Sequence, residues 1–146
     1  MEIDTICDIM EIIGGIDMKK GFDILISLIL NMCLFLIWVL EMILTGDVPV
    51  RFENSEASGI IIALLIFTVI YSLYLIKSKC NILNLVQSSM FLFLWGMGLL
   101  QELKYSYHPN NRLVNTIAFV LSLLLVIQII FKIVKNNKLK KLNTSN

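Results

Sequence analysis

The residues of this chain whose types could do chemistry are polar side chains that interrupt long apolar runs. Lipid offers such groups no hydrogen-bond partner, so they normally turn toward neighbouring helices or a wet cavity. Here they could line a binding pocket open to the cytoplasm, or they could hold helices together by hydrogen bonds. We favour the second interpretation, because such bonds are common in membrane bundles. The candidate polar cluster consists of Ser27, Asn31, Ser72, Asn84, Gln87, Ser88 and Gln128.

Glu41 is the one acid that lies well inside an apolar run, near the end of the first run. A carboxylate at that depth can reach the membrane interface, pair with a cation or carry a proton. Arg51 follows in the next loop, so Glu41 and Arg51 form a candidate outer ion pair. A structural ion pair or snorkelling is the simpler interpretation, and proton coupling is the alternative.

No combination of residues in the sequence indicates catalysis or metal binding. Cys7, Cys33 and Cys80 have no CxxC spacing, and His108 has neither a second His nor a carboxylate at ligand spacing. Ser-His-Asp, Cys-His and HExxH sets are not found either. The sequence therefore predicts no catalytic, cofactor-binding or metal-binding residues, and a protein that is not an enzyme.

The elements that must position the polar residues are membrane-spanning helices. The chain is 58% hydrophobic and 16% charged, with a mean hydropathy of +0.83, which is far outside the range of soluble domains. Backbone amides in lipid must be satisfied within the segment, so apolar runs of this length are expected to be helices. We predict an all-α, polytopic integral membrane protein, a bundle of four transmembrane helices over about 23–44, 60–76, 82–100 and 113–131.

Basic residues predict the orientation of this bundle, because short loops rich in Lys and Arg stay in the cytoplasm. Both termini, and the loop between the second and third spans, are then cytoplasmic. The opposite side receives Arg51, Lys104 and Arg112. The bundle covers residues 18–135, and residues 136–146 form a basic cytoplasmic tail that fixes the topology. The lysines on the predicted cytoplasmic side are Lys19, Lys20, Lys77, Lys79, Lys132, Lys135, Lys138, Lys140 and Lys141.

Residues 1–17 have two interpretations. The codons of Gly14 and Gly15 could contain a ribosome-binding sequence before Met18, so that this segment would be a mis-annotated leader. Apolar residues also recur at helical spacing in it, with acids on another face, which is typical of an amphipathic helix. In that case the two glycines end an acidic helix and form a hinge to the first span. Both interpretations stay open.

Two resemblances bear on function. In size and number of spans the chain resembles the small multidrug transporters, which centre their chemistry on a Glu in the middle of the first span. This chain has Asn31, Met32 and Cys33 at that depth, so the resemblance implies a small transporter in outline, without the acid that proton-coupled export needs.

The second resemblance lies in "GDVPVRF", directly after the first span. It is similar to the P-x-H-F-like element of the membrane immunity proteins that protect bacilli from their own toxin. Pro49, Val50 and Phe52 match, whereas Arg51 replaces the His, and the Gly-Asp-rich continuation is missing. An extended loop in which Pro49 stops the helix explains the same residues more simply.

The sequence therefore predicts a small bacterial protein of the cell membrane whose partners are the lipid bilayer and, in addition, another membrane protein or a second copy of itself. We expect it to act through its helix faces and loops, as an immunity factor or an accessory subunit of a membrane complex does. A holin-like pore former or a small transporter is the alternative. Neither a nucleic acid nor a cofactor is expected.

Overall fold

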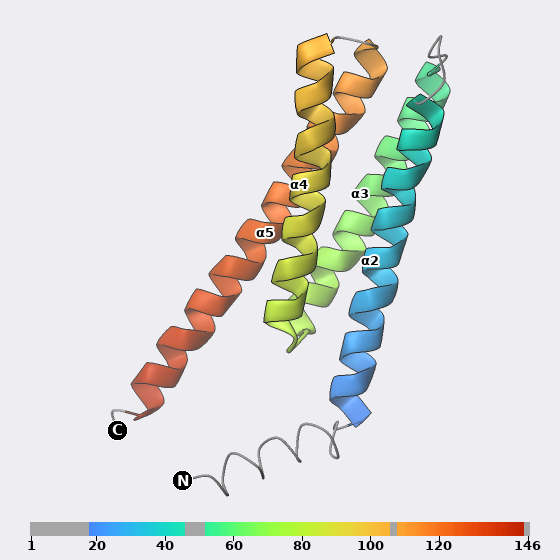
Figure 1. The fold of residues 1–146 in the computed structure, drawn as a ribbon. Coiled ribbons are helices and arrows are strands. Elements are labelled where there is room, and N and C mark those ends of the chain that lie inside the picture. Colours follow the sequence, from blue (N-terminus) through green and yellow to red (C-terminus); the bar gives the residue numbers. More distant parts are fainter. Residues whose placement is uncertain (1–17, 46–51, 106–107, 145–146) are drawn as a thin grey trace, which may run out of the picture.

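The protein was analysed as a computed structural model, which describes residues 18–45, 52–105 and 108–144. Those residues form four α-helices, α2 (Met18–Thr45), α3 (Asn54–Lys77), α4 (Asn81–Tyr105) and α5 (Pro109–Thr144) (Figure 1). Each helix contains a segment long and apolar enough to cross a membrane. The prediction of an all-α chain with four such helices is confirmed. Residues 1–17 lie outside the described residues, and so does Arg51.

The helices extend beyond the apolar runs, and the ends of α3 are capped by polar residues. At the start of α3, the Glu56 carboxylate accepts the backbone N–H of Glu53 at 3.0 Å, completing a reciprocal capping box. At its end, the Ser78 N–H donates to the Tyr74 carbonyl at 2.9 Å. Pro109 opens α5, where its missing N–H costs no helical hydrogen bond. Polar residues that flank the predicted spans thus belong to the bundle.

The four helices run up and down in sequence order, so that α2 begins and α5 ends at the same end of the bundle (Figure 1). The most extensive packing joins α4 to α5; α3 packs on α5, and α2 packs on α3 and α4. Glycines bring α4 and α5 close together. A Cβ at Gly96 would lie 3.3 Å from the Phe119 ring, and one at Gly98 would clash with the side-chain oxygen of Asn115.

Apolar side chains both fill the bundle and cover its outside. Trp95, Tyr71 and Leu64 are almost completely buried, whereas many Leu, Ile, Val and Phe side chains, such as Ile82 and Phe131, are strongly exposed. Apolar surface of this extent on four spanning helices implies contact with the lipid bilayer. The chain is therefore a multi-pass membrane protein.

Charged residues gather at the ends of the helices. α5 has 36 residues and is roughly 54 Å long, well beyond the roughly 30 Å of a hydrocarbon core. Its second half diverges from α4 and carries Lys132, Lys135 and Lys138 (Figure 1). The residues of the predicted basic tail therefore begin within this helix. We call this end of the bundle, which also contains the α3–α4 turn, the lysine end.

Candidate functional site

Five polar side chains meet inside the half of the bundle nearer the lysine end, and we call them the amide cluster. The Ser27 hydroxyl on α2 lies 2.6 Å from the Asn84 side-chain oxygen and 2.9 Å from that of Gln87, both on α4. The Asn31 side-chain nitrogen donates to Gln87 at 2.6 Å and to the Tyr71 hydroxyl at 3.2 Å. Tyr71 on α3 donates to Asn84 at 3.2 Å. The amide cluster therefore joins three helices.

A carboxylate extends this network to the α3–α4 turn. Asp23, in the second turn of α2, accepts hydrogen bonds from the Tyr74 hydroxyl at 2.7 Å and from the Lys79 backbone N–H at 2.8 Å. The Ser78 hydroxyl donates to the same carboxylate at 3.2 Å and accepts the Asn84 side-chain N–H at 2.9 Å. Asp23 thus holds the turn against α2, a role that the sequence did not predict.

Ser72 and Gln128 form a separate pair between α3 and α5. The Ser72 hydroxyl donates to the Gln128 side-chain oxygen at 2.9 Å, and the Gln128 side-chain nitrogen donates to the Ser72 carbonyl at 3.1 Å. One turn further along α5, the Lys132 ammonium donates to the carbonyls of Leu75 and Ser78. This lysine satisfies carbonyl groups at the C-terminus of α3.

Ser88 belongs to neither group of hydrogen bonds. It is 1% exposed, and its hydroxyl has no hydrogen-bond partner among the described residues. It lines a cavity of about 10 Å³ together with Thr68 and Ser122. That volume is at the lower limit for a single water molecule.

A second polar group, which we call the carboxylate cluster, lies toward the opposite end of the bundle. One carboxylate oxygen of Glu41 accepts the side-chain N–H of Asn115 at 3.0 Å. The same nitrogen lies 2.9 Å from the Asn111 side-chain oxygen, and Asn111 donates to Glu102. Each of these four side chains is more than nine-tenths buried. The cluster therefore links α2, α5 and α4.

Two atoms of the carboxylate cluster have no hydrogen-bond partner among the described residues. They are one carboxylate oxygen of Glu102 and the side-chain oxygen of Asn115. Glu41 does not reach the interface as a snorkelling side chain would, since it is only 1% exposed. Because Arg51 lies outside the described residues, the ion pair between Glu41 and Arg51 stays a prediction.

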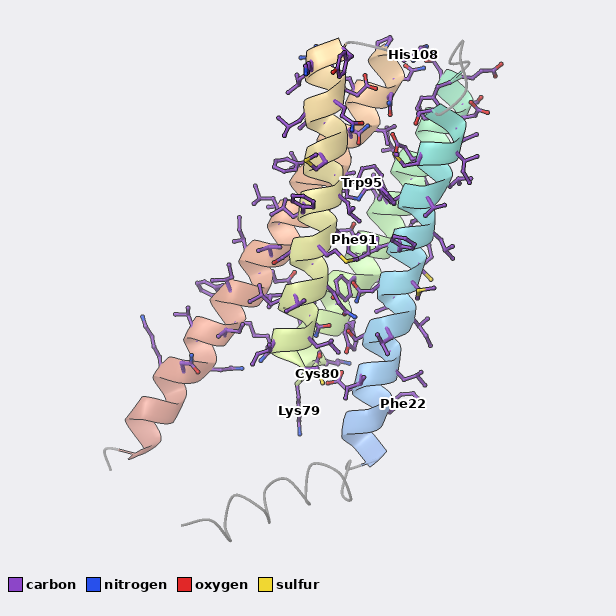
Figure 2. All side chains as sticks on the ribbon, viewed as in Figure 1. Phe22, Lys79, Cys80, Phe91, Trp95 and His108 are labelled. Atoms are coloured by element: carbon purple, nitrogen blue, oxygen red, sulfur yellow. The ribbon has the colours of Figure 1, made fainter. Side chains whose placement is uncertain are left out.

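An apolar layer separates the two clusters. Figure 2 shows Phe91 and Trp95 in the middle of the bundle, between α4 and α2 in this view. Trp95 is 1% exposed and is among the largest fully buried side chains of the described residues. The hydroxyls at this depth face the small cavity described above. The buried apolar residues between the clusters are Leu34, Ile37, Leu64, Phe91, Trp95 and Ala118.

The structure thus divides the polar residues named from the sequence. Ser27, Asn31, Asn84 and Gln87 come together, whereas Ser72 pairs with Gln128 elsewhere, and Ser88 lines the small cavity. The carboxylate cluster was missed except for Glu41. The spacing of Asn111 and Asn115, which are one helical turn apart, was a signal that could have revealed it. A second signal was that Glu102, near the end of the third span, is at the same depth as these two residues near the start of the fourth.

Within the described part of the chain, no group of three His, Cys, Asp or Glu side chains could hold a metal ion. His108 lies at the end of the bundle opposite the lysine end (Figure 2), where its ring makes an edge contact with Phe52 and accepts the Asn110 backbone N–H at 3.3 Å. These contacts are those of a residue that organises the start of α5. The chemistry available in the amide cluster and the carboxylate cluster is therefore hydrogen bonding and carboxylate charge.

No protein-family model, no curated protein and no solved structure matches the chain.

Proposed function

We propose that this protein is a non-enzymatic membrane protein that acts by binding another membrane protein through its helix faces and loops. Immunity factors and accessory subunits of membrane complexes act in this way. The observation that carries the proposal is the filled interior of the bundle. Trp95, Phe91 and Leu64 are nearly completely buried between the two polar clusters. A monomer packed in this way offers no continuous polar path for a solute.

The hydrogen bonding of the amide cluster supports the same proposal. Asn84, which is completely buried, bonds to Ser27 on α2, to Tyr71 on α3 and to Ser78 in the α3–α4 turn. Most polar atoms of the cluster bond to one another, and the Asn31 side-chain oxygen is its one buried atom without a partner among the described residues, so the cluster has little capacity left for a ligand. We therefore interpret the amide cluster as interhelical packing, and the recognition surface is on the outside of the bundle.

Photo-crosslinking in the native membrane tests this proposal. A photoreactive amino acid is placed at Leu36 or Ile43, which are exposed on α2, and at Ile127 or Phe131, which are exposed on α5. A partner bound to the face of one helix should give the same discrete adduct from both positions on that helix. The two positions on the other helix should not give this adduct. An adduct of twice the mass of the chain would identify a second copy. Lipid adducts alone at all four positions would contradict the proposal.

The carboxylate cluster favours a second candidate, a small transporter that carries a cation or a proton. Glu41 and Glu102 are both buried and are joined through Asn111 and Asn115. Intramembrane carboxylates often mark an ion pathway. Protein reconstituted in liposomes should then take up protons or Na⁺ down an imposed gradient, and Glu41→Gln should stop this uptake. If the protein only binds a partner, neither the wild type nor the Glu41→Gln variant should show ion uptake.

We also propose that the lysine end faces the cytoplasm of a bacterial cell. Lys77, Lys79, Lys132, Lys135 and Lys138 are all at this end, whereas Lys104 and Arg112 are at the other. Single cysteines at positions 54 and 136, in a chain without its native cysteines, test the orientation. An impermeant thiol reagent added to intact cells should label position 54. Labelling at position 136 instead would reverse the topology.

A further inference from the structure

An open cavity lies at the lysine end, between the α3–α4 turn and the diverging half of α5. Its volume is about 830 Å³, which is within the range of ligand-binding pockets. The turn residues Ser78 to Asn81 form one side, and α5 contributes the other through Lys132, Ile133, Asn136 and Asn137. Figure 2 shows Lys79 at this turn, pointing away from the helices. The cavity belongs to neither of the two polar clusters.

Three lysines line this cavity, which makes it electropositive. Lys77 and Lys79 are exposed, whereas Lys132 is partly buried and donates to carbonyls at the end of α3. The neighbouring acid, Asp23, already accepts hydrogen bonds from Tyr74, Ser78 and the Lys79 backbone. Two exposed ammonium groups beside a third that is held by carbonyl groups are suited to bind an anion.

The start of α4 adds to the positive potential of the cavity. Asn81, Ile82 and Leu83 line it, and their backbone N–H groups precede the first backbone bond of the helix, from Asn84 to Cys80. The first turn of α4 contains no acidic residue. No acid of α4 itself therefore offsets the positive end of the helix dipole, and the carboxylate at this turn is that of Asp23 on α2, which accepts the Lys79 backbone N–H.

Apolar residues form the rest of the wall. Ile76 is 64% exposed and Ile82 is 77% exposed, and Ile24, Leu83 and Ile133 also line the cavity. Ile76 and Ile82 lie near the ends of the segments that are long and apolar enough to cross a membrane. A free phosphate ion would leave these side chains without a partner.

We propose that this cavity binds one phospholipid with an anionic head group. The phosphate lies between Lys77, Lys79 and the first turn of α4, and an acyl chain covers Ile76 and Ile82. Basic pockets between spanning helices suit anionic head groups, because the lysine charges add to the attraction of the helix terminus. This site does not depend on the proposed function, since any membrane protein can hold a structural or regulatory lipid.

Native mass spectrometry of the purified protein tests the proposal with chain-matched phosphatidylglycerol and phosphatidylcholine. The wild-type protein should retain one phosphatidylglycerol in preference to phosphatidylcholine. The double variant Lys77→Gln/Lys79→Gln should reduce this preference about tenfold or more, since each lysine near a membrane surface contributes about 1 kcal/mol. Both side chains are exposed, so the fold should be retained.

The matched control is Lys135→Gln/Lys138→Gln. These lysines are exposed on α5 at the same end of the bundle, but they do not line the cavity. The control removes the same charge and should keep the preference for phosphatidylglycerol. Equal losses in both double variants would overturn the proposal in favour of general attraction to the surface. A wild-type protein without any preference would overturn it as well.

Two water-soluble competitors separate a lipid site from a phosphate site. Inorganic phosphate and glycerophosphoglycerol, which is the head group without acyl chains, are added at concentrations far above that of the lipid. A lipid site keeps its phosphatidylglycerol, because neither competitor covers the apolar wall. Displacement of the lipid by either competitor would overturn the assignment to a phospholipid.

Discussion

The side-chain nitrogen of Asn115 on α5 lies 3.0 Å from the carboxylate of Glu41 on α2, across 74 positions of the sequence. Both side chains are almost completely buried. The two helices make little other contact, since α2 packs mainly on α3 and α4. This hydrogen bond therefore joins the first described helix to the last. The sequence had predicted a different partner for Glu41, namely Arg51 in the loop that follows α2.

Asn115→Ala should destabilise the bundle by about 1–3 kcal/mol, because it leaves a buried carboxylate without its donor. The measurement is thermal unfolding of the purified protein in detergent. Thr116→Ala is the control, since Thr116 is exposed and its hydroxyl donates to a carbonyl of its own helix. Equal stability of the Asn115 variant and the wild type would show that the hydrogen bond contributes nothing.

Gly98→Ala should also destabilise the bundle, by about 1–3 kcal/mol, because the new methyl group would displace the Asn115 amide. Gly59→Ala is the control, since a Cβ there meets no described atom within 4 Å, and Ala favours a helix. The double variant Gly98→Ala/Asn115→Ala gives a sharper test. Its loss should be smaller than the sum of the single losses, because the clash disappears with the amide. Additive losses would contradict this explanation.

Asn84→Ala and Ser88→Ala should differ in their effect on the stability of the bundle, although the two residues are one helical turn apart. Asn84 bonds to three other side chains, so its loss should cost about 1–2 kcal/mol. The Ser88 hydroxyl has no partner among the described residues, so its removal should be neutral or stabilising. Denaturation of both variants in the same detergent measures the difference. A large loss for Ser88→Ala would mean that a bound water completes its hydrogen bonding.

Trp95→Ala should open the apolar layer between the two clusters. The cavity of about 10 Å³ would grow by the volume of the indole, enough to admit water. We expect liposomes containing this variant to leak protons faster than liposomes containing the wild type. Phe93→Ala is the matched control, because Phe93 is an aromatic residue of the same helix that is 65% exposed. Equal leakage from both variants would show that Trp95 does not seal the bundle.

Helix ends show where reasoning from the sequence reached its limit. The apolar run of the third span ends at Leu100, yet α4 continues to Tyr105 and brings Glu102 into the interior. Asn111 precedes the predicted fourth span and is also buried. A hydropathy profile assigns such polar residues to loops, because it scores the transfer of each residue from water to lipid separately. It does not include the hydrogen bonds that they make to one another.

The sequence by itself determined that the chain forms four apolar helices, and that the lysines gather where the second span meets the third and where the fourth ends. These properties follow from segment length and composition, because lipid requires each backbone to satisfy its own hydrogen bonds. Only the tertiary structure decided that Ser27 meets Asn84, that Ser72 meets Gln128 instead, and that Glu41 meets Asn115. The physical reason is that partners on different helices depend on the rotation of each helix about its axis. Packing between the side chains of neighbouring helices sets that rotation. The spacing of residues along the sequence does not determine it.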